Sequence, residues 1–164
     1  IEYYGLRFGT VNGYSPIMRN DVMINAMTTN GLDNGEIKLY IKDIMRPILG
    51  INDLCRSIFK IIECDQDKRG LYNLASFNKT AEQIAYEVSE TINVPVKEYE
   101  TDPTQISNTK AQTKCYNFSI STRKFERAFK FEFNETVESI TKSIVDNYSN
   151  IIQTNRGGVY NYVQ

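Results

Sequence analysis

The sequence contains no histidine, so its carboxylates are the first candidates for acid–base chemistry. Without histidine the chain cannot form a Ser/His/Asp triad, use imidazole as a general acid or base, or build a zinc site that needs imidazole. Asp21 and Asp53 could act as general acids, but both lie where helices are expected to begin, and a carboxylate is stabilised at that end of a helix. We interpret both as structural residues.

Cysteine chemistry has equally little support. Cys55, Cys64 and Cys115 form no Cys-x-x-Cys pair. The first two lie on one expected helix, where a turn of about 100° per residue points them in nearly opposite directions. We expect reduced, mostly buried thiols, and we predict no metal site.

Charge and length exclude further classes of function. The chain has 164 residues, with 19 basic and 20 acidic side chains and no run of like charge, so we expect one compact unit that does not bind nucleic acid. No apolar stretch approaches the roughly 20 residues of a membrane-spanning helix, and the N-terminus has no signal-peptide pattern, so we expect a soluble, cytoplasmic protein. Because no Met begins the sequence, we expect a fragment or a processed piece.

Strands and helices are expected to alternate along the chain, which is typical of a parallel α/β sheet. Apolar and β-branched runs predict strands over residues 5–11, 37–41, 46–51, 70–75 and 94–99. Helical spacing predicts helices near residues 21–29, 52–63, 80–92, 121–129 and 137–148, and polar residues 101–112 predict a loop.

Particular residues set the expected ends and contacts of the helices. Thr80 and Gln83 have the spacing of a capping box. Asn30–Gly31 should end the first helix, and Asn52 and Ser121 should cap later ones. Four phenylalanines are interpreted as a small core rather than as a surface for stacking bases: Phe125, Phe129, Phe131 and Phe133.

The strands around Leu6 and Leu71 are expected to lie side by side in parallel. Two such strands cannot by themselves form a parallel sheet that is covered on both faces. A partner chain or a missing segment must complete the sheet.

Five segments follow one another in an order that carries a resemblance. They are LRFGTVNGYSP at 6–16, MRNDVMIN at 18–25, RPILGIND at 46–53, GLYNLAS at 70–76 and QTKCY at 112–116. The first is similar to a strand and turn with the pattern Arg-x-x-Asn/Thr-x-Tyr-Gly-Pro, and the third to an Arg-Pro/Asp-x-x-His/Tyr-Val-x-Asp signature. Together they resemble the extended short-chain dehydrogenase/reductase family, the NAD(P)-dependent epimerases and dehydratases that act on sugar nucleotides. Asn12, Tyr14 and Gly50 depart from the family pattern.

The resemblance implies an α/β fold: the C-terminal part of a Rossmann-type parallel sheet, with two strands, plus a small α+β substrate-binding lobe. Residues 1–92 would hold the last strands and helices of the dinucleotide-binding domain, with substrate-lobe segments inserted at about 14–50. Residues 93–154 would form the C-terminal substrate-binding lobe, and residues 155–164 would form a tail.

The resemblance also implies a set of site residues. Arg46 would grip the diphosphate of a sugar nucleotide, because a guanidinium offers a planar set of donors and keeps its charge. The remaining substrate contacts would be Thr10, Arg19, Asn25 and Lys114, and the cofactor contacts would be Phe8 and Val11. Other interpretations stay open: Thr10 could pack within a strand, Arg19 and Asn25 could be solvated or capping residues, and Lys114 could be an ordinary solvated lysine.

The implied activity is that of an NAD- or NADP-dependent epimerase, dehydratase or reductase, of which this chain would supply the substrate-binding portion. The family's glycine-rich dinucleotide turn and its Ser/Thr and Tyr-x-x-x-Lys catalytic set have no counterpart in the sequence, so catalysis would lie in a missing N-terminal segment. The expected partners are a nucleotide-diphosphate sugar, that N-terminal segment and, in the full-length protein, a second copy in a homodimer. Two alternatives remain: a non-catalytic family relative that acts as a binding or assembly subunit, and an unrelated α/β interaction domain.

Overall fold

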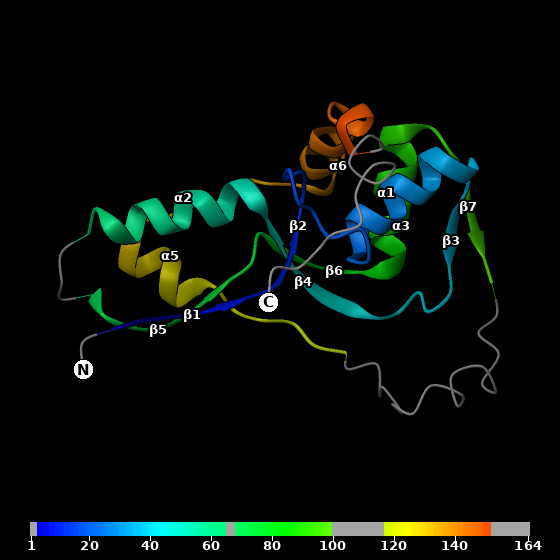
Figure 1. Cartoon of the computed structure of the whole chain (residues 1–164). Helices are drawn as coiled ribbons and strands as arrows, with labels where there is room; N and C mark the ends of the chain where they lie inside the picture. Colours follow the sequence, from blue (N-terminus) through cyan, green and yellow to red (C-terminus); the bar gives the residue numbers. More distant parts are fainter. Residues whose placement is uncertain (1–2, 65–67, 100–116, 152–164) are drawn as a thin grey trace, which may run out of the picture.

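The two strands that were expected to lie side by side do pair. In the computed structural model, which describes residues 3–64, 68–99 and 117–151, β1 (Tyr4–Phe8) lies parallel to β5 (Gly70–Leu74) (Figure 1). Gly5 is in register with Leu71, and Leu6 with Tyr72. The predicted parallel pairing is therefore confirmed.

The residues expected to form one strand from 5 to 11 form two strands instead. The chain breaks at Gly9, whose N–H donates to the carbonyl of Leu74 at 2.8 Å. It continues as β2 (Thr10–Asn12), which pairs in parallel with β4 (Met45–Gly50) rather than with β5. A Cβ at Gly9 would lie 2.8 Å from the carbonyl oxygen of Pro47, so glycine is needed for this close approach to β4.

Two further strand pairings complete the described sheets. β4 pairs antiparallel with β6 (Phe77–Thr80) on the edge opposite β2, and β3 (Ile37–Leu39) pairs in parallel with β7 (Val96–Glu98). Pro47 was expected at a strand start or an edge, but it is the third residue of β4, the central strand of the β2–β4–β6 sheet. The pairing of β4 with β2 begins only at Ile48. The missing N–H of proline therefore costs β4 no bond to β2.

Helices form where the apolar spacing predicted them. They are α1 (Met23–Asn34), α2 (Ile51–Ile62), α3 (Ala81–Ile92), α5 (Arg123–Phe129) and α6 (Val137–Val145). α3 begins with the predicted capping box, in which the Gln83 N–H donates to Thr80 Oγ1 and the Thr80 N–H donates to Gln83 Oε1. The sequence signal for this helix start is confirmed.

The predicted end of α1 is wrong. The helix continues through Gly31 to Asn34, and Gly35, with a φ of 71°, is its C-cap. A Cβ at Gly31 would lie 2.7 Å from Ile92 Cδ1, so the missing side chain lets α1 approach α3 closely. Glycine at this position serves packing and does not stop the helix.

Two predicted helix caps are also wrong. Asn52 lies inside α2, whose N-cap is Gly50 and has no side-chain hydrogen bond. The N-cap of α5 is Thr122 rather than Ser121, and it too lacks a side-chain cap. For α2, the carboxylate of Glu135, which is distant in the sequence, accepts a hydrogen bond from the N–H of Asp53 in the first turn.

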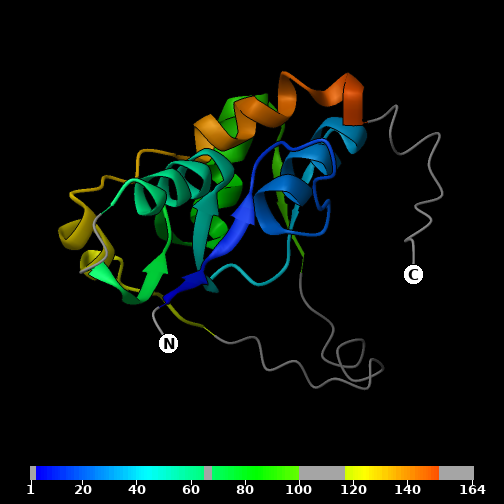
Figure 2. The ribbon, with the colours of Figure 1, turned by 60° about the vertical axis from the view of Figure 1, so that its left-hand side comes forward.

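Two apolar clusters hold these elements together. One joins α1, α3 and α6 to β3 and β4, and Figures 1 and 2 show α6 against α1 and α3. The other joins β1 and β5 to α2 and α5, with Phe125 and Phe129 buried and Phe131 and Phe133 packed against them, which confirms the predicted phenylalanine core. Residues 117–151 thus contribute to both clusters, and the division into domains stays a prediction.

The described cysteines are free thiols. Cys64 is partly buried and forms a hydrogen bond with the hydroxyl of Tyr4 at 3.2 Å. Cys55 is exposed on α2, which corrects the expectation that the thiols are mostly buried. Cys115 lies outside the described residues.

None of the helices in the described ranges combines the length and the apolar character needed to cross a membrane. α1, α2 and α3 have 12 residues each, against the roughly 20 that a span requires. Across the same ranges, no cluster of three or more His, Cys, Asp or Glu side chains could hold a metal ion.

Candidate functional site

A hollow of about 370 Å³ brings together four of the residues that the sequence nominated: Phe8, Thr10, Val11 and Arg19. The other residues that line it are Gly9, Val22, Pro47 and Phe118. We call this set the Phe8 hollow. Residues from β1, β2, β4 and the loop before α1 converge there although only some of them are neighbours in the chain.

The strand order explains the position of the Phe8 hollow. Phe8 is the last residue of β1 and is in register with Leu74, the last residue of β5. In open α/β sheets, ligands bind outside the carboxyl ends of the parallel strands. The hollow lies at that end of the β1–β5 pair, so its location suits a binding site.

Arg46 stands beside the Phe8 hollow on β4, and it is not among the residues that line it. Its side chain is half-buried. The guanidinium Nη1 donates to the Met45 carbonyl at 3.1 Å, and the guanidinium carbon lies 5.7 Å from the centre of the Phe118 ring. Phe118 lines the hollow, so its ring links the guanidinium to the margin of the hollow.

Arg19 lines the hollow, but its guanidinium forms an ion pair with a neighbouring carboxylate. Its Nε and Nη2 donate to the two carboxylate oxygens of Asp21 at 2.9 and 2.6 Å, and both side chains are exposed. The hydrogen bond from Arg19 lowers the pKa of the Asp21 carboxyl below its ordinary value. Asp21 precedes α1 and pairs with Arg19, as a structural residue would.

Asn25 is buried away from the Phe8 hollow and both ends of its amide are used. Its Oδ1 accepts from the N–H of Gly13 at 2.8 Å, and its Nδ2 donates to the carbonyl of Arg19 at 2.8 Å. Asn12, equally buried, accepts from the N–H of Ile24 at 3.0 Å. The two amides fix the loop between β2 and α1, and the substrate contact expected of Asn25 stays a prediction.

One predicted site residue lies outside the described structure, and one residue of the hollow was not predicted. Lys114, the second expected contact to a diphosphate, lies outside the described residues. Phe118 lines the hollow, but nothing in its local sequence distinguished it from the other aromatic residues. Only the fold brings Phe118 beside Arg46.

A second cluster of charged groups joins α2 to the segment between α5 and α6. Asp53 is completely buried, and its carboxylate accepts hydrogen bonds at 2.7–3.2 Å from Arg56 Nη1, Ser76 Oγ and the N–H groups of Asn134 and Glu135. We call these five residues the Asp53 junction. A buried carboxylate is tolerated because its oxygens are so fully bonded, which confirms the structural interpretation of Asp53.

Glu135 completes the junction at the amino end of α2. Its Oε2 accepts from the N–H of Asp53 at 3.0 Å, and its Oε1 accepts from Asn52 Nδ2 at 3.1 Å. Burial raises the pKa of the Glu135 carboxyl above its ordinary value, and these hydrogen bonds oppose the rise. A Cβ at Gly50 would overlap the Glu135 carboxylate, so the departure of Gly50 from the family pattern makes room for this contact.

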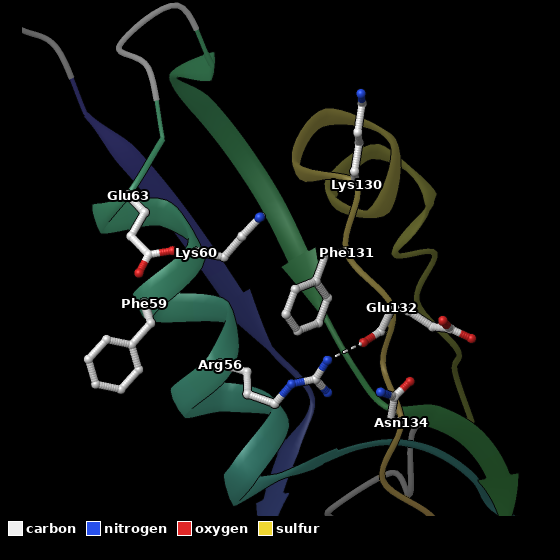
Figure 3. Close-up of a pocket in the computed structure, with 8 residues that line it drawn as sticks. All are labelled: Arg56, Phe59, Lys60, Glu63, Lys130, Phe131, Glu132 and Asn134. Atoms are coloured by element: carbon white, nitrogen blue, oxygen red, sulfur yellow. Dashed lines mark hydrogen bonds between the residues drawn. The ribbon is translucent and has the colours of Figure 1, made fainter.

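Figure 3 shows the outer side of the junction, where Arg56 reaches from α2 to the carbonyl of Glu132 at 3.1 Å. A second hollow of about 410 Å³ lies here. Its lining mixes basic and acidic side chains and holds none of the predicted site residues: Arg56, Phe59, Lys60, Glu63, Lys130, Phe131, Glu132 and Asn134. The Phe8 hollow is therefore the better candidate.

Comparison with known proteins gives matches in structure alone. No family model and no curated protein matches the sequence. L-threonine dehydrogenase from Phytophthora infestans is similar with a TM-score of 0.70 and 13% identity, over 90% of this chain and 49% of that chain. UDP-glucuronic acid 4-epimerase from Bacillus cereus, in complex with UDP-glucuronic acid and NAD, gives 0.69 and 14% over 93% and 46%. dTDP-glucose 4,6-dehydratase from Bacillus anthracis, in complex with NAD, gives 0.65 and 17% over 88% and 45%.

These matches bear on the predicted fold. The parallel β1–β5 pair and the structural matches agree with the predicted Rossmann-type arrangement. This chain spans about half the length of each similar protein. It therefore has the α/β fold of roughly half of each of these proteins, as the order of its motifs predicted.

Proposed function

We propose that this chain is the substrate-binding portion of an NAD(P)-dependent sugar-nucleotide epimerase, dehydratase or reductase. The observation that carries the proposal is the Phe8 hollow at the carboxyl end of the β1–β5 pair, with Arg46 at its margin. Phe8, Thr10 and Val11 come from one motif and Arg19 from the next, and all four line this hollow.

Arg46 binds the diphosphate of the substrate in this proposal. A guanidinium suits this role because its planar donors match phosphate oxygens and its charge persists at every physiological pH. Arg19 assists more weakly because Asp21 already accepts two of its hydrogen bonds. Thr10 contributes a hydroxyl, which can donate to or accept from the sugar.

The cofactor assigned to the full-length protein is NAD or NADP. The residues present fit one side of a nicotinamide ring, because Phe8 and Val11 give the hollow an apolar wall and Phe8 is 48% exposed. When bound, the cofactor supplies hydride transfer. The residues of this chain hold the sugar nucleotide in position for it, and such positioning is itself a large part of catalysis.

The proposal extends to the rest of the protein. A separate N-terminal segment supplies the glycine-rich turn, the catalytic tyrosine and lysine and the remaining strands of the sheet, and the full-length protein is a cytoplasmic homodimer. Within this chain, residues 1–92 complete the dinucleotide-binding domain, with substrate-lobe segments inserted at about 14–50, and residues 93–154 form the C-terminal substrate-binding lobe.

The proposal is tested by titrating UDP, dTDP and GDP into the full-length protein and its Arg46→Ala variant by calorimetry. Loss of a charge-assisted phosphate contact should weaken the tightest of these complexes by about 1.5–3 kcal/mol, roughly 10- to 150-fold in Kd. Arg127→Ala is the matched control, because Arg127 is an exposed arginine on α5 that does not line the hollow. Equal Kd values for the wild type and Arg46→Ala would refute the assignment.

A further inference from the structure

Phe118 lies against Arg46 in a way that no motif predicted. The guanidinium carbon of Arg46 is 5.7 Å from the centre of the Phe118 ring, which is within the range of a cation–π contact. The ring is 48% exposed and also lines the Phe8 hollow. One side chain therefore contacts both the arginine and the space beside it.

The backbone around Phe118 is tied to the start of β4. The N–H of Met45 donates to Asn117 Oδ1 at 3.0 Å, and the N–H of Phe118 donates to the carbonyl of Met45 at 3.4 Å. Asn117 Nδ2 also donates to the carbonyl of Asp43 at 3.4 Å. These bonds join two segments about 70 residues apart and set the ring beside the residue that follows Met45.

The geometry suits an arginine that must bind an anion. An arginine side chain has many rotamers, and ordering it on binding costs free energy. A ring against one face of the guanidinium restricts those rotamers without occupying its donors, because the donors lie in the plane of the group. Contact between Nη1 and the Met45 carbonyl restrains the same group from the backbone side.

We infer that Phe118 is a positioning residue that holds the Arg46 guanidinium at the margin of the Phe8 hollow for a nucleoside diphosphate. This inference rests on the proposed function and deepens it, because it names the group that orients the phosphate-binding arginine. It also distinguishes Phe118 from Phe8, whose ring forms a wall of the hollow.

The first test is calorimetric titration of the full-length protein with the tightest of UDP, dTDP and GDP. Phe118→Leu keeps an apolar side chain of similar size without the ring, and it should raise Kd about two- to fivefold, the range for a half-exposed cation–π pair. Phe118→Tyr restores the ring and should return Kd to the wild-type value. Phe59→Leu removes an exposed ring from α2, outside the hollow, and should leave Kd unchanged. Thermal unfolding of each variant checks that the fold is intact.

The decisive test is a double-mutant cycle with Arg46→Ala. If Phe118 acts through Arg46, Phe118→Leu should have no further effect on Kd in the Arg46→Ala background. The same two- to fivefold loss of affinity in both backgrounds would mean that the ring contacts the ligand directly. An unchanged Kd for Phe118→Leu alone would mean that the ring has no effect on binding. Either result overturns the inference. Both leave the proposed function standing, which fails only if Arg46→Ala itself binds normally.

Discussion

The Asp53 junction and the Phe8 hollow use charged side chains in opposite ways. In the junction, the Asp53 carboxylate is fully buried and is bonded to groups from α2, from the residue before β6 and from the segment before α6. At the hollow, Arg46 is half-buried and Arg19 is exposed. Charges that hold elements together are removed from water and fully bonded, whereas charges that bind a ligand must stay within its reach. Substitutions should therefore cost stability at the first region and binding at the second.

The largest effect on stability is expected from Asp53→Ala. The substitution leaves the Ser76 hydroxyl and the N–H groups of Asn134 and Glu135 without their acceptor, and buried donors without partners are costly. We expect the free energy of unfolding to fall by about 3–5 kcal/mol, as when a buried ionic network loses one member. Urea denaturation followed by circular dichroism measures it.

Asp21→Ala is the matched control for this comparison. Asp21 is an exposed aspartate that also pairs with an arginine, and exposed ion pairs contribute roughly 0–1 kcal/mol. Similar losses for the two alanine variants would contradict the contrast between the two regions.

A smaller loss is expected from Gly50→Ala. The added methyl group would overlap the Glu135 carboxylate, and overpacking of this kind costs about 1–3 kcal/mol. The same substitution in a Glu135→Gly background should cost much less, because that change removes the carboxylate and also the Glu135 Cβ, which would lie 2.9 Å from the added methyl group. Unfolding free energies of the four proteins measure the coupling, and an identical cost for Gly50→Ala in both backgrounds would show that Glu135 is not the obstacle.

Local rules predicted the parts of this fold that neighbouring residues determine. The capping box of α3 depends on Thr80 and Gln83 alone, so its spacing was sufficient. The parallel pairing around Leu6 followed from the alternation of strands and helices. Local composition also grouped the phenylalanines of the second cluster correctly, because they are close together in the sequence.

The same rules failed where distant segments meet. Asn52 was expected to cap α2, but the first turn of that helix is bonded by the carboxylate of Glu135. This carboxylate accepts from the N–H of Asp53, 82 residues away in the sequence. Gly31 was expected to end α1, but its role depends on the approach of Ile92 from α3. At the site, motifs nominated Phe8, Thr10, Val11 and Arg19, which line one hollow, but no pattern could reveal that Phe118 lies beside Arg46.

The smallest effects are expected from Arg19 and its partner, and they sharpen the account of the hollow. Arg19→Ala should lower the free energy of unfolding by no more than about 1 kcal/mol, since both side chains of the pair are exposed. It should also weaken nucleotide binding less than Arg46→Ala does, because the Asp21 carboxylate competes with phosphate for the same donors.

Asp21→Asn removes that competing charge, so nucleotide affinity should rise, by up to about fivefold if the pair is worth 1 kcal/mol. Calorimetric titration of the full-length variants measures both changes, and an Arg19→Ala loss as large as that of Arg46→Ala would show that Asp21 does not restrain Arg19. Affinity that is unchanged in Asp21→Asn would place Arg19 outside the phosphate site and leave Arg46 as its arginine.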